Sequence, residues 1–282
     1  MINIYQLLID NCIDALTDSF RNVYGSDANE METVIATEGR VLLAKIATTD
    51  ALYHNLEHTI YVVSAGNAIL QGMLKEEISI PAKIWLHFIV ALLCHDIGVV
   101  KGICAEDEAF KREYVSGDNS DKVILPIGVS DASLLPYHLE RGQVFVREYF
   151  SNHPLVDSKL VREYIERTRF PVPATAEYQQ TSDYAGLVRA ADLVGQLSDP
   201  RYLKKMNALF CEFEETGLTK LMNYKTPEDV LLGYPNFFEN MVQPFIQEGV
   251  NFLQKTPAGE AFLVSLYGNL QTAITEIESK TT

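Results

Sequence analysis

The spacing of apolar residues is the feature of this 282-residue chain that most restricts its fold. Apolar side chains recur with the period of an amphipathic α-helix over most of the sequence. No segment gives a convincing run of the strict alternation that a half-buried β-strand requires. The pattern therefore predicts an all-α fold, a bundle of many helices.

Capping residues and prolines divide this pattern into separate helices. Asp50 is a candidate N-cap for a helix that carries Tyr53, His54 and His58 and runs to about Leu74. Two helices are predicted within the first 46 residues, and others at residues 82–97, 134–150, 155–168, 182–197, 200–215, 227–232, 235–253 and 257–277. Residues 101–132, between the first two of these ranges, are rich in charge, Gly, Ser and Asp, which predicts a long irregular connection.

Composition indicates a globular protein with a strongly acidic surface. Hydrophobic residues make up 47% of the chain and charged residues 22%, and no repeat or obvious linker divides it, so we expect one helical domain over residues 1–282. The formal net charge is -15, which repels polyphosphate backbones and argues against a nucleic-acid polymer as partner. A small anionic substrate stays open, because a bound metal can reverse the local field.

Cysteine usage and the N-terminal sequence indicate a cytoplasmic protein. The four cysteines form no CxxC pair, so buried reduced thiols are expected instead of a disulfide framework. The first residues lack a basic leader and a long apolar stretch. The longest apolar run, residues 84–94, is interrupted by His87 and is too short to cross a bilayer. No membrane partner is expected, and a homo-oligomer is an open alternative.

Histidine and aspartate residues at three separated places carry the chemical signal. On a helix, His54 and His58 are spaced i, i+4 and would share one face. His95 and Asp96 are adjacent at the end of an apolar helix, and Asp192 lies between apolar neighbours in a later one. An ionised carboxylate in such surroundings costs several kcal/mol unless it is paired or metal-bound. The set predicts a site for one or two divalent metal ions, with Zn, Mn, Fe and Mg as candidates.

Each of these signals has a simpler explanation when it is taken alone. A single histidine on an apolar helix is usually a hydrogen-bonded core residue, and an HD dipeptide often occurs by chance. The burial expected for both Asp96 and Asp192 favours the metal site over these alternatives.

The order H…HD…D in these residues resembles the HD phosphohydrolases, an all-α superfamily that binds one or two divalent metals. The segment YHNLEHT, residues 53–59, is similar to the YHNxxHA signature of class I cyclic-nucleotide phosphodiesterases, and the likeness covers about residues 50–250. The resemblance implies that His54 is the general acid. It also implies that His58 binds metal together with the HD pair and the later aspartate.

Several positions depart from the phosphodiesterase pattern. Gly98 and Val99 stand where that family has an Asp and a His that position water around a second metal, and Leu135 stands in place of a glutamate. His138 is a candidate ligand for the second metal that would compensate, or else a buried hydrogen-bonded histidine. The purine-binding glutamine of the family falls on Tyr234.

Residues that would contact a substrate follow from the same likeness and from their position near the expected ligands. These candidates are Tyr53, Tyr137, Arg169, Gln196, Tyr234 and Phe237. Phe237 would clamp a base, and the guanidinium of Arg169 would suit a phosphate. Gln196 lies one helical turn after Asp192, although a surface amide is as good an explanation for it, as an exposed ion pair is for Arg169.

Taken together, these residues predict a metal-dependent phosphohydrolase that cleaves a phosphoester of a small nucleotide, with a cyclic-nucleotide phosphodiesterase as the closest resemblance. Water activated by the metal would attack phosphorus, and His54 would protonate the leaving oxygen. Two alternatives stay open. One is an HD-type nucleotidase or alarmone hydrolase, and the other is a non-catalytic HD sensor or scaffold that keeps the metal.

Overall fold

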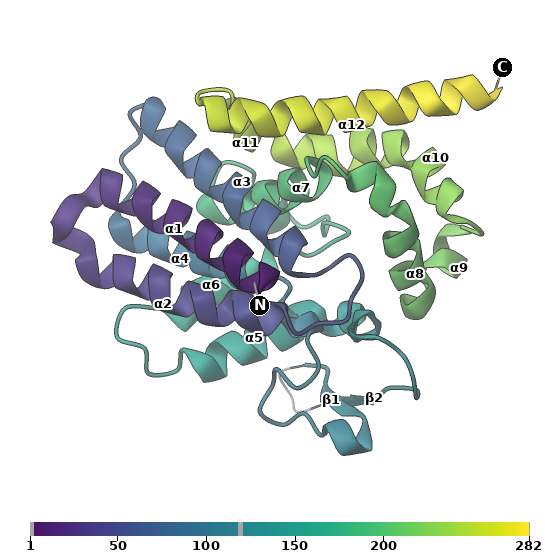
Figure 1. Cartoon of the computed structure of the whole chain (residues 1–282), viewed down its shortest axis with the longest axis horizontal. Helices are drawn as coiled ribbons and strands as arrows, with labels where there is room; N and C mark the ends of the chain where they lie inside the picture. Colours follow the sequence, from purple (N-terminus) through teal and green to yellow (C-terminus); the bar gives the residue numbers. More distant parts are fainter. Residues whose placement is uncertain (1–2, 118–120, 282) are drawn as a thin grey trace.

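The computed structural model describes residues 3–117 and 121–281. Helices joined by mostly short connections make up the molecule (Figure 1), which confirms the predicted all-α fold. The α-helices in chain order are α1 (Ile4–Tyr24), α2 (Asn29–Ile46), α3 (Leu56–Lys75), α4 (Ala82–Cys94), α5 (His138–Tyr149), α6 (Ser158–Glu166), α7 (Tyr184–Leu197), α8 (Met206–Thr216), α9 (Leu218–Met222), α10 (Pro227–Phe237), α11 (Gln243–Leu253) and α12 (Pro257–Thr281).

The long connection between α4 and α5 contains the one sheet found in the described residues. Strands β1 (Glu113–Val115) and β2 (Lys122–Ile124) form a short antiparallel pair. The sequence pattern did not predict these strands, because a three-residue strand is too short to show alternation. The rest of the connection is irregular, as expected from its composition.

Helix α4 is the most deeply buried element of the bundle. Every residue from Trp85 to Cys94 is buried. The stretch Ala82–Val99 is long and apolar enough to cross a membrane, but 83% of it is buried inside the protein. Packing in the core therefore accounts for the apolar composition of this helix.

A close approach of α3 and α7 brings two parts of the site together. A Cβ atom on Gly195 of α7 would lie 2.5 Å from the Cα of Val62 in α3. Any larger residue at Gly195 would push the two helices apart. Asp192 lies one turn before Gly195, and His58 lies one turn before Val62. The absence of a side chain at Gly195 therefore sets the distance between a carboxylate and an imidazole.

The start of α3 differs from the prediction. The helix begins at Leu56, and its N-cap is Asn55, whose side chain accepts hydrogen bonds from backbone N–H groups of the first turn. Asp50, the predicted cap, instead accepts a hydrogen bond of 2.6 Å from the backbone N–H of Asp131. Asparagine and aspartate cap helices about equally well, so their propensities did not distinguish the two positions.

The predicted helix break before Pro235 is also wrong. Helix α10 continues through Pro235, and a π-helical turn, Phe238–Val242, joins it to α11. Proline removes one backbone donor and crowds the preceding turn, which usually ends a helix or distorts it. Here the helical path continues, and the wider π turn follows within a few residues of the proline.

A buried ion pair fixes the connection after α4 against α5. The guanidinium of Arg141 in α5 donates hydrogen bonds of 3.0 and 2.9 Å to the two carboxylate oxygens of Asp107. It also donates to the backbone carbonyls of Gly98, Val100 and Val115. Both charged side chains are almost completely buried. One arginine thus ties the turn that follows α4 and strand β1 to the first half of α5.

We predict that Arg141→Met lowers the free energy of unfolding by about 3–5 kcal/mol, because the carboxylate of Asp107 then stays buried without its partner. Urea unfolding followed by circular dichroism measures the loss. Lys280→Met is the matched control, since it breaks an exposed pair with Glu228 and should change stability little. Equal losses in the two variants would contradict the role given to Arg141.

Candidate metal centre

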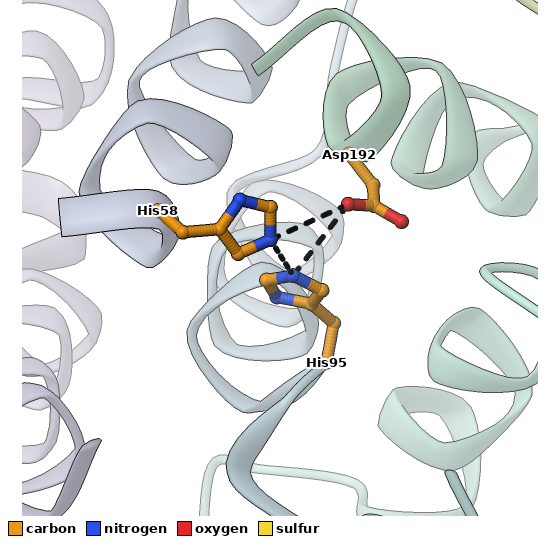
Figure 2. A group of neighbouring side chains, drawn as sticks. All are labelled: His58, His95 and Asp192. Atoms are coloured by element: carbon orange, nitrogen blue, oxygen red, sulfur yellow. Dashed lines mark hydrogen bonds and ion pairs between the residues drawn. The ribbon is translucent and has the colours of Figure 1, made fainter. Parts of the chain in front are cut away.

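Four side chains from three separate segments meet inside the bundle. His58 lies in the first turn of α3, His95 directly follows the last residue of α4, Asp96 comes next, and Asp192 lies within α7. Figure 2 shows His58, His95 and Asp192 pointing toward one another. These three form a group that could hold a metal ion, since one donor atom from each lies within 4.8 Å of the others.

The distances between donor atoms are short. The Nε2 atoms of His58 and His95 are 3.3 Å apart. Oδ2 of Asp96 lies 3.1 Å from Nε2 of His58 and 3.2 Å from Nε2 of His95. Oδ1 of Asp192 lies 3.9 and 3.6 Å from the same two nitrogens. Two imidazole nitrogens and two carboxylate oxygens therefore face one small volume.

Local backbone geometry orients His95 and Asp96. The Nδ1–H of His95 donates a hydrogen bond of 2.7 Å to the carbonyl of Leu92, one turn earlier in α4. With the proton on Nδ1, Nε2 of the neutral ring carries the lone pair that a metal requires. Helix α4 ends at Cys94, three residues earlier than predicted. Asp96 therefore lies outside the helix, with its carboxylate among the histidines.

The donor set fits a divalent cation. Oδ2 of Asp96 is buried and has no hydrogen-bond partner among the described residues, although Nε2 of His58 and of His95 lie 3.1 and 3.2 Å from it. Burial opposes ionisation of Asp96, but when no metal is bound the charge of protonated His95 outweighs it and holds the pKa of this carboxyl well below its usual range; a bound cation would take the place of that charge and leave the His95 ring neutral. A buried ionised carboxylate without a hydrogen bond is costly, and a bound cation would offset the cost. Imidazole and carboxylate ligands together suit Zn, Mn or Fe.

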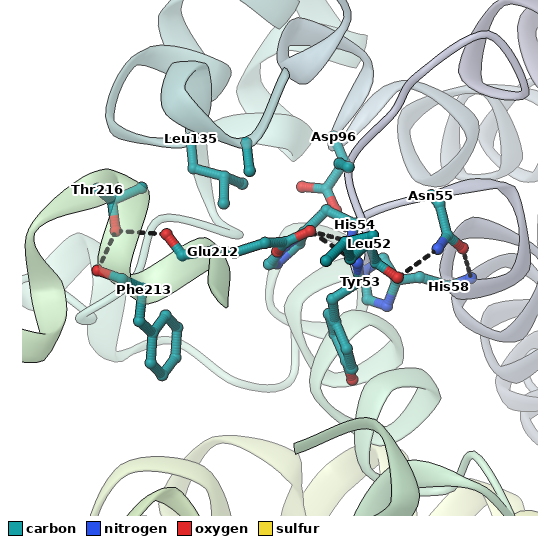
Figure 3. A network of polar contacts seen from close by, with 12 residues as sticks. Leu52, Tyr53, His54, Asn55, His58, Asp96, Leu135, Glu212, Phe213 and Thr216 are labelled. Carbon is teal, nitrogen blue, oxygen red and sulfur yellow. Dashed lines mark hydrogen bonds and ion pairs between the residues drawn. The ribbon is translucent and has the colours of Figure 1, made fainter. Parts of the chain in front are cut away.

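His54 lies beside this cluster, but not on the helix that carries His58. Tyr53 and His54 precede α3, so the prediction that His54 and His58 share one helix face is wrong. Glu212 of α8 holds the segment instead (Figure 3). Its Oε1 accepts hydrogen bonds of 2.7 and 3.2 Å from the backbone N–H groups of Tyr53 and His54, and its Oε2 lies 2.5 Å from Nδ1 of His54.

Glu212 also keeps a proton on His54. Burial disfavours the charged imidazole, but the carboxylate of Glu212 outweighs it and raises the pKa of His54 to about 9. The centroids of the His54 and His58 rings are 5.4 Å apart. A protonated imidazole next to a candidate metal ligand is an arrangement suited to general acid catalysis.

Sequence analysis did not identify Glu212 as a functional residue. The available signal was the acidic run EFEETG, residues 212–217, in which Glu212 alone of the three glutamates is buried. A buried carboxylate needs a partner, and here the partner is 158 residues away along the chain. Helical periodicity in α8 could show which face is apolar, but not which distant residue meets it.

His138, at the start of α5, lies on the other side of Asp96. Its Nε2 is 3.6 Å from Oδ1 of Asp96, whereas Oδ2 of the same carboxylate faces His58 and His95. The Nδ1–H of His138 donates to the carbonyl of Leu135, at 2.5 Å, which leaves Nε2 directed at Asp96. This position is compatible with a second metal ion next to Asp96, and that role of His138 stays a prediction.

Packing explains why the chain departs from the phosphodiesterase pattern after Asp96. A Cβ atom at Gly98 would lie 1.9 Å from the backbone oxygen of His138 and 2.6 Å from the nitrogen of Gly142. A side chain at this position would therefore displace the start of α5. Val99 is buried in a small apolar cluster with Ala51. His138 is close to Asp96 because Gly98 lets its backbone approach.

Solvent reaches the cluster unevenly. The side chains of His58 and His95 are only 4% and 1% exposed. Those of His54, His138 and Asp192 are 18%, 24% and 17% exposed. Water or a small molecule would therefore approach from the side of the proton donor, the candidate second ligand and the aspartate of α7.

Three of the residues predicted to contact substrate, Tyr53, Gln196 and Tyr234, lie next to Tyr202. Tyr53 is buried, with its ring centroid 5.6 Å from that of His58. Gln196 hydrogen-bonds the phenol of Tyr202. Tyr234 is only 2% exposed, and its ring packs 5.1 Å from that of Tyr202. The structure thus places Tyr53 and Tyr234 in the packed interior and does not bring them to the open side.

The other three predicted substrate-binding residues are half-buried. Arg169 is paired with Glu166, at 2.5 Å, and with Glu140, at 2.8 Å. Its charge is therefore already balanced by two carboxylates, which matches the ion-pairing alternative. Phe237 and Tyr137 are partly accessible, and their contact with a substrate stays a prediction.

The fold and the site define an all-α protein with a candidate His/Asp metal centre. The sequence model of the Npun_R2479-like family matches residues 2–276, and the chain belongs to this family. No curated protein matches the chain. The family description names no activity, so the resemblance to HD phosphohydrolases stays a prediction.

We predict that Asp192→Asn greatly weakens metal binding, because it removes the charge of one of the four ligands. Wild-type protein at a Mn²⁺ concentration about 100 times Kd should gain about 2.7 kcal/mol of unfolding free energy. The variant should gain much less. Asp18→Asn, an exposed residue of α1, is the control and should behave as wild type. Equal stabilisation of wild type and Asp192→Asn by Mn²⁺ would rule out this site.

Proposed function

We propose that this protein is a metal-dependent phosphohydrolase that cleaves a phosphoester of a small nucleotide. One observation carries the proposal: the imidazole of His54, whose pKa is raised to about 9, adjoins a cluster of two imidazoles and two carboxylates that fits a divalent cation. Phosphoester hydrolysis requires activated water, charge neutralisation and a proton for the leaving oxygen. The metal held by the cluster would meet the first two requirements, and His54 would meet the third.

The ligands His58, His95, Asp96 and Asp192 would hold the metal. When bound, a divalent cation lowers the pKa of water to about 7 and offsets negative charge on phosphoryl oxygens. A hydrogen bond within the protein orients one of these ligands for metal binding. The carbonyl of Leu92 fixes the proton of His95 on Nδ1, so that Nε2 is the nitrogen directed into the site.

His54 would supply the proton to the leaving oxygen. Its Nδ1 is engaged by Glu212, which leaves Nε2–H of the charged ring as the available donor. Because Glu212 also accepts hydrogen bonds from the backbone N–H groups of Tyr53 and His54, the ring is held in position as well as charged. A well-placed general acid contributes about 10²- to 10⁴-fold to rate.

The proposed substrate is a small phosphoester or nucleotide, and no nucleic-acid polymer or membrane is involved. A net charge of -15 disfavours a polyanionic chain, while one phosphoryl group can be neutralised by the metal. Within residues 3–117 and 121–281, the one stretch long and apolar enough to cross a membrane is 83% buried. We place this activity in the cytoplasm, with a homo-oligomer as a possible form.

Two measurements test the proposal together. The first is metal analysis of purified protein, and the second is a screen of cyclic nucleotides, nucleoside monophosphates and alarmones with added Mn²⁺. The proposal expects bound metal and turnover of at least one phosphoester, and the screen also separates a phosphodiesterase from a nucleotidase. Metal bound without turnover of any phosphoester would instead favour a sensor or scaffold.

We predict that His54→Ala keeps the metal but loses turnover by about 10²- to 10⁴-fold, because only the proton donor is removed. Initial rates with the best substrate of the screen measure this, alongside metal content. His153→Ala, which changes a histidine outside the cluster, is the control and should keep full turnover. Unchanged turnover in His54→Ala would eliminate the assigned acid.

Glu212→Gln is predicted to shift the pH dependence of kcat/KM. Glu212 raises the pKa of His54, so the acid form persists to higher pH in the wild type. Removing the negative charge lowers that pKa, and the basic limb of the profile should move to lower pH while the metal content is kept. A basic limb at the same pH in both proteins would show that Glu212 does not set the protonation of the catalytic group.

A further inference from the structure

A cavity of about 560 Å³ lies between α6 and the start of α7, apart from the metal centre. Its volume is within the range of about 300–1,000 Å³ that is usual for small-molecule sites. It shares no residue with the metal cluster. Most of its wall is charged or phenolic, and the residues that matter for recognition are Arg162, Tyr164, Arg167, Glu177, Asp183 and Tyr184.

A buried guanidinium group, that of Arg167, lines this cavity, and a second, that of Arg189, lies next to it. Arg167 is only 6% exposed; its Nη2 donates to the carbonyl of Gln180 and to Asp183, and its Nε has no hydrogen-bond partner among the described residues. Arg189 is 1% exposed and donates to the same carbonyl. Burial and the charge of Arg167 lower the pKa of Arg189 to about 10.

Two buried guanidinium groups thus lie close together. Asp183, about half exposed, forms an ion pair of 3.1 Å with Arg167. A buried charge without a full partner is costly. An anionic group bound in this end of the cavity would offset that cost, and a carboxylate matches the planar donors of arginine.

The exposed part of the cavity lining carries charges of both signs. Lys159 and Glu163 lie 3.8 Å apart and form an exposed pair, and Glu177 adds a further exposed carboxylate. Glu166 also lines the cavity, but Arg169, Gln143 and the phenol of Tyr178 already hydrogen-bond its carboxylate. A simple anion would therefore leave the negative charge of Glu177 in the cavity lining unbalanced. A ligand with both charges suits this arrangement better.

We propose that the cavity binds a small zwitterion of the α-amino acid class, with its carboxylate toward Arg167 and its ammonium toward Glu177. The rings of Tyr164 and Tyr184 provide an apolar wall for the side chain of the ligand. This site is independent of the metal centre and of the proposed hydrolase activity, so it can be tested on metal-free protein.

The test begins with a thermal-shift screen of the twenty protein amino acids, one at a time, followed by calorimetric titration of those that stabilise the protein. For each binder, the analogue without the amino group, the analogue without the carboxylate, and inorganic phosphate are titrated in parallel. We expect each analogue to bind about tenfold more weakly or worse, since each loses one charge-assisted contact. If no amino acid binds, or if phosphate or the analogue without the amino group binds as tightly, the proposal is overturned.

Variants then locate the site. Glu177→Gln changes an exposed residue, so it should fold normally, weaken the amino acid about tenfold and leave binding of the analogue without the amino group unchanged. Glu228→Gln removes an exposed carboxylate of α10, outside the cavity, and should change neither. Unchanged amino-acid affinity in Glu177→Gln would overturn the assignment. Metal content should be the same in all three proteins, which separates this result from any failure of the metal centre.

Discussion

Two carboxylates buried beside the end of an apolar helix set the conditions that the rest of the site must meet. Asp96 and Asp192 lie where water cannot fully stabilise their charge, so positive charge has to be supplied from within. His58 and His95 bring two imidazole nitrogens within 3.3 Å of each other, where both could bind a cation that supplies this charge. Oδ2 of Asp96 nevertheless has no hydrogen-bond partner among the described residues, which fits a cluster that could hold a cation.

The bundle positions these groups through contacts that involve the backbone. Gly195 lets α7 lie against α3, and Gly98 lets α5 lie against the turn after α4. Arg141 then fixes that turn by donating to three backbone carbonyls and to Asp107. Glu212 fixes the segment before α3 in the same way, by accepting backbone N–H groups. Each of these contacts joins elements that are distant in sequence.

The difference between local properties and contacts of distant residues explains which features could be predicted from the sequence. The helical period and the apolar run before Asp96 predicted the all-α fold and the burial of the HD pair, because both are local properties. The pairing of His54 with Glu212 could not be predicted, since it depends on how α8 packs, and its residues are 158 apart. Tyr234 was placed near a substrate by resemblance, but in the structure it fills the core against Tyr202.

Anomalous diffraction from crystals of the protein grown with Mn²⁺ tests the central claim most directly. The account predicts a metal peak bonded to Nε2 of His58 and His95 and to carboxylate oxygens of Asp96 and Asp192, at roughly 2.0–2.2 Å. A peak elsewhere in the molecule, or no peak with these four side chains still in contact, would contradict it.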